Sequence, residues 1–349
     1  MIRRVSRQVK VGNVFIGGDA PIAIQSMLNA PASDFEGNLC QLKALEEAGC
    51  EIVRMAVPDM DAVKVLGKLK EHSQIPLVAD IHFNYKLALE SLEAGVDKIR
   101  INPGNIGSEE RVAAVADACA LKGVPIRIGV NSGSVEADLL EKFGGATPEA
   151  MVESAFRHVK LLENCGFYDT VISIKSSDVE NMVAAYTLVA ENCNYPLHLG
   201  VTEAGTERSS LVKSSIGIGS LLLKGIGDTL RVSITDSPVK EIYAARNILN
   251  AVNLRVETPQ IVACPTCGRT KIDLVSLASQ VEEAVKNIKK PIKIAVMGCV
   301  VNGPGEAREA DIGIAGGDGC AVLFKKGEIL RKVSEEGIVK ELLDEIDKI

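Results

Sequence analysis

The sequence predicts an α/β protein in which a (β/α)8 barrel, the TIM-barrel fold, is followed by a smaller α/β domain. Eight apolar segments of strand length alternate with amphipathic segments of helix length over about 235 residues, which is the number and size of such a barrel. Helical segments repeatedly end at a glycine, as in Ala48-Gly49 and Ala94-Gly95, where a left-handed residue is expected to stop the helix. A doubly wound parallel sheet is the alternative architecture for this part of the chain.

The elements of the barrel follow one another in a regular order. Residues Val9–Ile16 alternate in polarity around a Gly-Asn pair and predict a β-hairpin before the first barrel strand. The first barrel helix is amphipathic, and Ser33 with Glu36 before it has the spacing of a capping box. The last barrel helix is expected over Pro238–Val252. The eight barrel strands are expected at Ile22–Met27, Glu51–Val57, Pro76–Ile81, Val96–Asn102, Pro125–Val130, Thr170–Lys175, Pro196–Val201 and Thr229–Thr235.

The remainder of the chain has the pattern of a small α/β domain built around cysteines. We place the two domains at residues 1–256 and 257–349, with a linker at Asn253–Thr258. In the second domain, strands are expected near Ile261, Ile292–Met297 and Ile312–Ala315, and helices near Ile272–Ile288 and Glu336–Ile346.

Composition and charge exclude several classes of function. The net charge is −7 and the chain has no tryptophan, so neither nucleic acid nor an anionic membrane is expected as a partner. The first residues lack the apolar run of a signal peptide, and no segment approaches the roughly 18 apolar residues of a membrane helix. A cytoplasmic location is therefore expected. The nine cysteines indicate reduced thiols plus a metal site, with five of them as small core residues: Cys40, Cys50, Cys119, Cys165 and Cys193.

Three cysteines stand in a pattern typical of a metal or redox site. Cys264 and Cys267 form a CxxC pair, and Cys299 lies in a loop rich in glycine and proline. All four histidines precede this region, so a fourth protein ligand would be Cys320 or a carboxylate such as Glu306. A structural zinc and a redox dithiol are alternatives. An iron–sulfur cluster held by three thiolates and a weaker oxygen ligand fits the spacing best.

Cationic side chains recur where the predicted barrel strands end. Five strands contribute one each: Arg54, Arg100, Arg127, Lys175 and Arg231. In strands buried on both faces, charged residues are expected only at a strand end and where they serve a function, because burying an unpaired charge is costly. Because five cations on one ring would repel one another, we expect a polyanion between them. A phosphorylated substrate, a diphosphate rather than a monophosphate, is the direct interpretation.

Polar residues at the same strand ends complete the predicted mouth of the barrel. Asn131, Thr202 and Ser233 could contact a substrate, and Glu203 is a candidate acid or base. The alternative for Glu203 is an ion pair with one of the arginines. The segment Ser214–Gly219 falls in the region that grips phosphate in many barrels, although as a glycine motif it is weak.

The combined pattern resembles one family, the bacterial iron–sulfur synthases of 4-hydroxy-3-methylbut-2-enyl diphosphate from the non-mevalonate isoprenoid pathway. The length is similar to the two-domain bacterial form. The motifs that carry the resemblance span both domains in order: IVRMAVP at Ile52–Pro58, ADIHFNY at Ala79–Tyr85, KIRINPGNIG at Lys98–Gly107, PIRIGVNSGS at Pro125–Ser134, LGVTEAG at Leu199–Gly205, GIGDTLRVSIT at Gly225–Thr235, CPTCGR at Cys264–Arg269 and GCVVNGPGE at Gly298–Glu306.

The resemblance implies a [4Fe–4S] cluster on Cys264, Cys267, Cys299 and Glu306. It implies 2-C-methyl-D-erythritol 2,4-cyclodiphosphate as the substrate, opened and dehydrated with two electrons from ferredoxin or flavodoxin. Glu306 and Glu203 would take the catalytic roles, Glu203 as the proton donor to the departing oxygen. The residues expected to bind the substrate are Arg54, Arg100, Arg127, Asn131, Lys175, Thr202, Arg231 and Ser233.

The linker length predicts how the two domains cooperate. Six linker residues span at most roughly 20 Å, whereas the last barrel helix is about 22 Å long and runs away from the mouth. We therefore expect a homodimer in which each cysteine domain caps the barrel of the partner, so that the active site is shared. Two other functions remain open: a zinc-stabilised barrel lyase or aldolase acting on a sugar phosphate, and an electron carrier.

Overall fold

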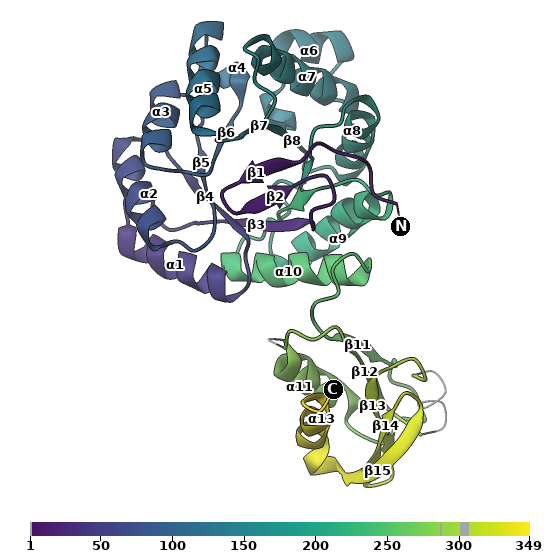
Figure 1. The fold of residues 1–349 in the computed structure, drawn as a ribbon. Helices are drawn as coiled ribbons and strands as arrows, with labels where there is room; N and C mark the ends of the chain where they lie inside the picture. Colours follow the sequence, from purple (N-terminus) through teal and green to yellow (C-terminus); the bar gives the residue numbers. More distant parts are fainter. Residues whose placement is uncertain (1, 287, 301–306) are drawn as a thin grey trace. The chain divides into compact units, whose positions relative to one another are not determined.

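A computed structural model describes residues 2–286, 288–300 and 307–349 of the chain. The chain divides into two compact units, Met1–Val252 and Asn253–Ile349, each of which is described by itself (Figure 1). The boundary expected after residue 256 falls in the segment that joins them. In the described part of the chain, no helix combines the length and the apolar character needed to cross a bilayer.

The first unit is a (β/α)8 barrel, as the sequence predicts. Its strands are all parallel and pair in the order β8-β7-β6-β5-β4-β3-β10-β9. A bridge between Ile172 and Leu197 joins the two ends of this series and closes the barrel. The strands are β3 (Ala23–Met27), β4 (Ile52–Ala56), β5 (Leu77–Asp80), β6 (Lys98–Ile101), β7 (Ile126–Asn131), β8 (Thr170–Lys175), β9 (His198–Leu199) and β10 (Thr229–Leu230).

Helices form the outer layer of the barrel (Figure 1). The loops after β6 and β7 carry additional short helices that the sequence analysis did not predict: α4 (Pro103–Ile106), the 3₁₀ helix η1 (Ser132–Ser134) and α6 (Ala137–Phe143). The main helices are α1 (Phe35–Glu47), α2 (Met60–His72), α3 (Tyr85–Glu93), α5 (Glu109–Lys122), α7 (Pro148–Asn164), α8 (Val179–Asn192), α9 (Glu207–Leu223) and α10 (Pro238–Ala251).

The predicted N-terminal hairpin is present and closes one end of the barrel. Strands β1 (Val9–Val11) and β2 (Val14–Ile16) pair antiparallel. Val11 and Ile16 are fully buried and pack with Ala23, Ile52 and Val78, which lie at or next to the amino-terminal ends of the first three barrel strands. The carboxyl ends of the strands are left for the site.

Two local expectations for the barrel helices are wrong. Asp34 rather than Ser33 caps α1, because its carboxylate accepts the N–H of Gly37 at 3.0 Å; an aspartate next to the first helical residue satisfies an otherwise free donor and favours the helix dipole. The segment Ser214–Gly219 is not a phosphate loop but lies within α9. A Cβ on Gly217 would come 2.9 Å from Met182 of α8, so this glycine allows the two helices to pack closely.

The expectation that five cysteines are core residues holds only in part. Cys50 and Cys119 are buried, and burial raises the pKa of each thiol to about 12. Cys165 and Cys193 are half-buried, whereas Cys40 is exposed. Cys40 lies on α1, whose buried positions are Asn38, Leu42 and Leu45, and therefore falls outside the face that packs on the barrel.

The second unit is a five-stranded mixed sheet. Strands β11 (Gln260–Ala263), β12 (Lys293–Met297) and β13 (Ile312–Gly317) are parallel, and β14 (Cys320–Lys325) and β15 (Glu328–Ser334) continue the sheet antiparallel. Helices α11 (Leu274–Val285) and α13 (Ile338–Ile346) pack on the sheet through a common apolar core. Strands β14 and β15 were not predicted: β15 is almost entirely exposed and lacks the alternation of a half-buried strand, whereas β14 is a short buried apolar run whose pattern is that of a strand.

Candidate active site

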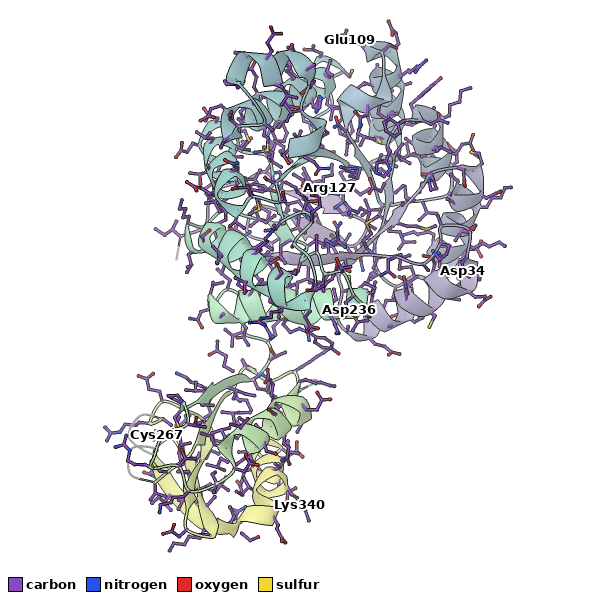
Figure 2. The ribbon with its side chains drawn as sticks, turned by 180° about the vertical axis from the view of Figure 1, so that it is seen from behind. Asp34, Glu109, Arg127, Asp236, Cys267 and Lys340 are labelled. Carbon is purple, nitrogen blue, oxygen red and sulfur yellow. The ribbon has the colours of Figure 1, made fainter. Side chains whose placement is uncertain are left out.

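The five predicted cations lie inside or at the mouth of the barrel, but not all of them lie at strand ends. Lys175 ends β8 and Arg231 follows β10, and Arg54 and Arg100 lie within β4 and β6. Arg127 is the second residue of β7 rather than near its end as predicted. Arg54, Arg100, Arg127 and Lys175 are at most 8% exposed, and Arg231 is partly buried just after β10. Arg127 lies in the middle of the barrel (Figure 2). The pKa of Lys175 is held well below its usual range, first by burial and then by repulsion from the four arginines. The structure therefore brings together the ring of cations that the sequence predicts.

Two buried carboxylates balance part of this charge. Asp80 at the end of β5 lies 2.9 Å from Arg100 Nη1 and 3.5 Å from Arg54 Nε. Burial alone would raise the pKa of Asp80, but Arg54, Arg100 and Arg127 together outweigh it and lower this pKa to about 2. Glu241 on α10 holds Arg231 at 2.7 Å. Asp80 is therefore ionised and serves to fix two arginines rather than to exchange protons.

Arg127 and Lys175 have no carboxylate partner among residues 2–252. The Nε and one Nη atom of Arg127 are buried without any hydrogen-bond partner in that part of the chain. Burial first, and then Arg54 and Arg100, lower the pKa of Arg127, although a guanidinium does not lose its proton in proteins. Because an unpaired buried charge costs several kcal/mol, this region has the electrostatic character of an anion site.

A second set of buried polar residues, Lys98 and His198, lies at the starts of β6 and β9. Neither was predicted as a site residue from the sequence. Lys98 is fully buried on β6, and its Nζ reaches only Gln25 Oε1, at 3.4 Å, among the described residues. His198 on β9 is also fully buried, with both ring nitrogens unpaired in the described chain. Burial, and then Arg127, Lys175 and Lys98, hold the pKa of His198 well below its usual value. The signal was present, because Lys98 precedes Arg100 by two residues and so faces the same side of the strand.

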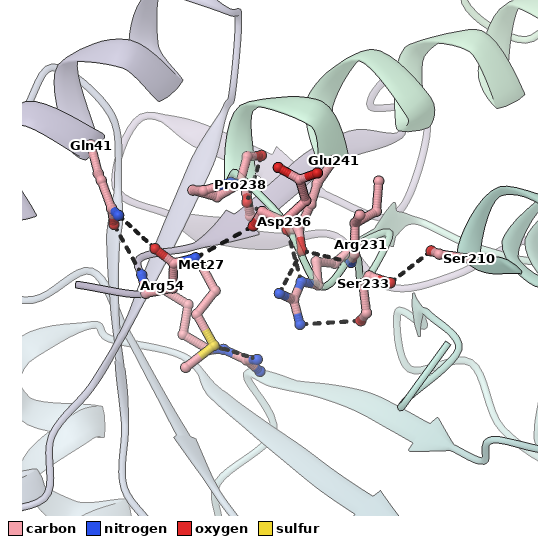
Figure 3. Close-up of polar contacts among 12 residues, drawn as sticks. Met27, Gln41, Arg54, Ser210, Arg231, Ser233, Asp236, Pro238 and Glu241 are labelled. Carbon is pink, nitrogen blue, oxygen red and sulfur yellow. Dashed lines mark hydrogen bonds and ion pairs between the residues drawn. The ribbon is translucent and has the colours of Figure 1, made fainter. Parts of the chain in front are cut away.

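Two glycines and a methionine shape the space around the cations. A Cβ on Gly129 would lie 2.5 Å from Arg100 Nε, and one on Gly200 would lie 3.1 Å from Lys175 Nζ. These positions allow long side chains to cross neighbouring strands. Arg54 also donates through Nη2 to the sulfur of Met27 at 2.9 Å (Figure 3). Sequence reasoning assigned none of these three supporting residues to the site.

The predicted polar residues also lie at this end of the barrel. Asn131 at the end of β7 stands opposite Lys175 in the β7–β8 register. Ser233 accepts a hydrogen bond from Arg231 Nη1 at 3.1 Å. Thr202 and Glu203 follow β9, and Glu203 is exposed with a left-handed backbone, φ 51°. Such a conformation is strained in a residue other than glycine and tends to occur at functional sites.

Glu203 does not pair with an arginine. Within the described residues it has no ion pair or hydrogen bond through its side chain, so the alternative that it serves only as a partner for one of the ring cations is not favoured. Its carboxylate remains available to a ligand or to water.

Two cysteine-bearing loops meet at the edge of the second sheet. Cys264 directly follows β11 and Cys299 closely follows β12, and these neighbouring parallel strands place their carboxyl ends together. The N–H of Gly298 donates to the sulfur of Cys264 at 3.2 Å. Cys267 is exposed, and its pKa is lowered, first by a hydrogen bond with the backbone of Arg269.

The surroundings of Cys264 and Cys267 favour thiolate ligands, although the three predicted cysteine ligands are not gathered into one metal-binding group among the described residues. An N–H···S contact and a thiol of lowered pKa both favour the ionised sulfur that iron requires. In the described residues, no three histidine, cysteine or acidic side chains are close enough together to hold a metal ion. Cys320 begins β14, and β13 lies between that strand and β12, which disfavours it as a fourth ligand. Glu306, the other candidate, lies outside the described residues.

Comparisons with known proteins agree with both units. The GcpE TIM-barrel domain model matches residues 6–246, and the GcpE protein C-terminal domain model matches residues 260–348. The 4-hydroxy-3-methylbut-2-en-1-yl diphosphate synthase (flavodoxin) of Caldanaerobacter subterraneus subsp. tengcongensis is 57% identical over 348 residues, covering 100% of this chain and 98% of that relative. The synthase of the same name from Clostridium perfringens is 57% identical, with 100% of both chains covered.

A solved structure supports the fold of the first unit alone. The 3-dehydroquinate dehydratase of Geobacillus kaustophilus has a TM-score of 0.51 at 14% identity, covering 71% of this chain and 98% of its own. With both domain models matched in order and full-length relatives above half identity, the chain belongs to the GcpE family.

Proposed function

We propose that this chain converts 2-C-methyl-D-erythritol 2,4-cyclodiphosphate to 4-hydroxy-3-methylbut-2-enyl diphosphate, a reductive step of isoprenoid precursor biosynthesis, with flavodoxin as the electron donor. The full-length relatives bear the name of this synthase and of flavodoxin. One observation in the barrel carries the substrate assignment: Arg127 and Lys175 are buried inside the barrel without a carboxylate partner in the described residues.

The ring of cations supplies the binding energy for the diphosphate. Asp80 already holds Arg54 and Arg100 in place, so these side chains need little further ordering when a ligand arrives. The negative charge of the diphosphate offsets the repulsion among the cations of the ring. The charge freed as the ring of the substrate opens would be stabilised by groups that are already oriented. The residues proposed to bind the substrate are Arg54, Arg100, Arg127, Asn131, Lys175, Thr202, Arg231 and Ser233.

We assign the cofactor to the cysteine loops of the second unit. Cys264, Cys267, Cys299 and Glu306 would hold a [4Fe–4S] cluster. When bound, such a cluster supplies single electrons at low potential and an iron site that an exchangeable carboxylate can expose. The protein's part is to keep the ligands ionised and oriented, and the N–H of Gly298 on Cys264 does this for one sulfur.

Glu203 is proposed as the proton donor to the departing oxygen. It follows β9 at the mouth, next to Thr202, and its side chain is unpaired within the described residues. General acid catalysis needs a group within hydrogen-bond reach of the oxygen that leaves. Replacement by glutamine, which keeps the shape and removes the acid, tests this assignment.

The active unit is proposed to be a homodimer whose active sites are shared. α10 ends at Ala251 and β11 begins at Gln260, so the joining segment is longer than the sequence suggested and spans about 27 Å when extended. The 14 residues of α10 occupy about 21 Å of this length along the barrel. Once the joining segment has run back along α10, little of its length is left to reach from the helix layer to the barrel axis. This favours capping of the mouth by the partner's cysteine unit. With its nine cysteines kept reduced, the enzyme is expected to work in the cytoplasm.

Metal analysis and turnover test the proposal together. Protein purified without oxygen should contain about four irons per chain, be brown, and consume the cyclodiphosphate when reduced flavodoxin is supplied. Colourless protein with stoichiometric zinc and no such turnover would favour the lyase or aldolase instead. Iron-loaded protein that exchanges electrons with flavodoxin but does not bind a diphosphate would favour the electron carrier.

A further inference from the structure

The last barrel strand, β10, ends before the predicted substrate-binding residues that follow it. β10 pairs with β3 only through Thr229 and Leu230, whereas the sequence predicted a strand as far as Thr235. The residues beyond it include Arg231 and Ser233. The N–H of Arg231 still donates to Leu199 of β9 at 3.0 Å, but further along the segment the N–H of Ile234 binds the Glu241 side chain and that of Thr235 binds a loop carbonyl. The sheet therefore holds the backbone of Arg231 on one side only, and it does not fix the position of the guanidinium.

Glu241 takes over where the strand pairing ends. Its side chain is 2% exposed and accepts four hydrogen bonds (Figure 3). Oε1 accepts from Arg231 Nη2 at 2.7 Å and from the N–H of Ile234 at 3.1 Å. Oε2 accepts from Arg231 Nε at 3.0 Å and from Ser26 Oγ at 2.7 Å. Four acceptances use the full capacity of a carboxylate, so Glu241 has no site left for a substrate.

The bidentate contact leaves part of the guanidinium for a ligand. Arg231 uses Nε and Nη2 on Glu241, and its Nη1 donates to Ser233. A guanidinium has five N–H groups, so two remain free of these contacts. The positive charges of Arg54 and Lys175 act on Arg231 across the barrel. Without Glu241 as its partner, the Arg231 side chain would be repelled away from the other cations of the ring.

We infer that Glu241 is a positioning residue for diphosphate binding: it acts through Arg231, whose guanidinium it holds in the ring against the repulsion of the other cations. This inference rests on the proposed function. The positioning role can be distinguished from a role in charge balance alone, because the two predict opposite effects of removing Glu241 on anion binding. If Glu241 only neutralised the site, its removal would raise the positive potential and tighten anion binding. If it positions Arg231, its removal weakens anion binding.

Binding of inorganic pyrophosphate to the full-length iron-loaded protein, measured by calorimetry without oxygen, distinguishes these roles. We expect Glu241→Gln to raise the Kd for pyrophosphate at least about tenfold, which corresponds to about 1.4 kcal/mol. In an Arg231→Met background, the same substitution should cause no further loss. Tighter binding by Glu241→Gln, or an equal loss in both backgrounds, would overturn the inference.

A matched control and a second variant guard against a general loss of structure. Asp97→Asn removes a carboxylate that binds Lys70 Nζ at 2.5 Å and the N–H of Leu77 at 2.8 Å, at the amino-terminal end of the barrel, and should leave the Kd unchanged. If Glu241→Gln does not fold, Glu241→Asp keeps the charge but withdraws it by one methylene. Unchanged pyrophosphate affinity in folded Glu241→Asp would then contradict the positioning role.

Turnover separates this inference from the proposed function. In Glu241→Gln the KM for the cyclodiphosphate should rise more than kcat falls, because the lost interaction orients a binding group. If even the unmodified protein does not convert the cyclodiphosphate but pyrophosphate binding responds as expected, the proposed function fails and the positioning role stands. Normal turnover with unaltered pyrophosphate binding in Glu241→Gln would instead overturn the positioning role and leave the proposed function standing.

Discussion

At the scale of single residues, the interior of the barrel holds more positive than negative charge. Lys98 is the clearest case, because it is fully buried and reaches only an amide oxygen, that of Gln25, among the described residues. Burial, and then Arg127 and Arg54, hold its pKa well below the usual 10.5. Folding therefore weakens the hold of Lys98 on its proton relative to the unfolded chain.

The pKa of Lys98 predicts a specific pH dependence of stability. Where the unfolded state binds more protons than the folded state, the free energy of unfolding rises with pH. The contribution of Lys98 is therefore least favourable below its lowered folded-state pKa and improves as the pH rises from there toward 10.5. Lys98→Met removes this contribution and should raise the free energy of unfolding at pH 7 by about 1–3 kcal/mol. Its advantage over the unmodified protein should shrink toward pH 10.

Urea unfolding of both proteins at pH 7 and at pH 10 checks this prediction. A variant less stable than the unmodified protein at pH 7 would show instead that Lys98 is charged and paired in the folded barrel. Because the two proteins differ only at one titrating residue, the difference between their pH profiles reports on Lys98 alone.

The glycine beneath Arg100 leads to a second prediction at this scale. In Gly129→Ala the new Cβ would come 2.5 Å from Arg100 Nε and 2.8 Å from Nη2, so the guanidinium must leave its position beside Asp80. We expect the fold to persist and the Kd for pyrophosphate to rise about tenfold, the loss of roughly one charge-assisted hydrogen bond.

A neighbouring glycine supplies the control for this substitution. Gly133 follows the same strand, has no heavy atom within 4 Å of the Cβ that alanine would add, and is not in a left-handed conformation. Gly133→Ala should therefore bind pyrophosphate normally. Equal losses from both alanines would mean that the loop, rather than the space around Arg100, controls the affinity.

At the scale of secondary-structure elements, the two ends of the barrel have separate tasks. The hairpin β1–β2 closes the amino-terminal end with Val11 and Ile16, both fully buried. Ile16→Ala should lower the free energy of unfolding by about 2–5 kcal/mol, the typical cost of such a truncation in a packed core. Phe15→Ala on the same strand, where the side chain is 46% exposed, should change stability little.

Because the two ends have separate tasks, the loss of stability in Ile16→Ala should not change anion binding at the candidate site. Pyrophosphate affinity measured on folded Ile16→Ala protein, below its unfolding transition, should equal that of the unmodified protein. A marked loss of affinity in that variant would show that the hairpin and the mouth are energetically coupled.

The elements also show what the sequence could and could not indicate. Residues Thr170–Lys175 form a strand with the predicted bounds, because a short apolar run between two helical segments favours a fully buried strand. The strand expected as far as Thr235 ends at Leu230, and beyond it the N–H of Ile234 binds the side chain of Glu241 on the following helix rather than a neighbouring strand. Periodicity reports burial and does not report which side chain a backbone N–H will bind.

The same distinction holds within the candidate site. Cationic residues in apolar strands stand out in the sequence, and the ring could be predicted from that contrast alone. Gly129 and Glu241 could not, because their importance depends on which side chain crosses over the glycine and which arginine the carboxylate holds. A histidine such as His198 can be recognised in the sequence as a titratable group. Its complete burial among cations could not be predicted, because it depends on barrel closure.

At the scale of the whole molecule, the open question is which chains build one active site. The barrel unit carries the cations and the second unit carries the cysteines, so the proposed reaction requires one of each. If each site combines units from two chains, a chain with Cys299→Ser and a chain with Arg54→Ala should complement each other in a mixed dimer. One of the two sites would then contain an intact barrel mouth and an intact set of cysteines.

Two affinity tags on co-expressed chains allow the mixed dimer to be isolated without oxygen and assayed. We expect about half the activity of the unmodified dimer, because one site is intact and the other carries both defects. Each variant alone should be nearly inactive. If the purified mixed dimer is no more active than its parents, each site is built within a single chain, and the joining segment must then carry the second unit to the mouth of its own barrel.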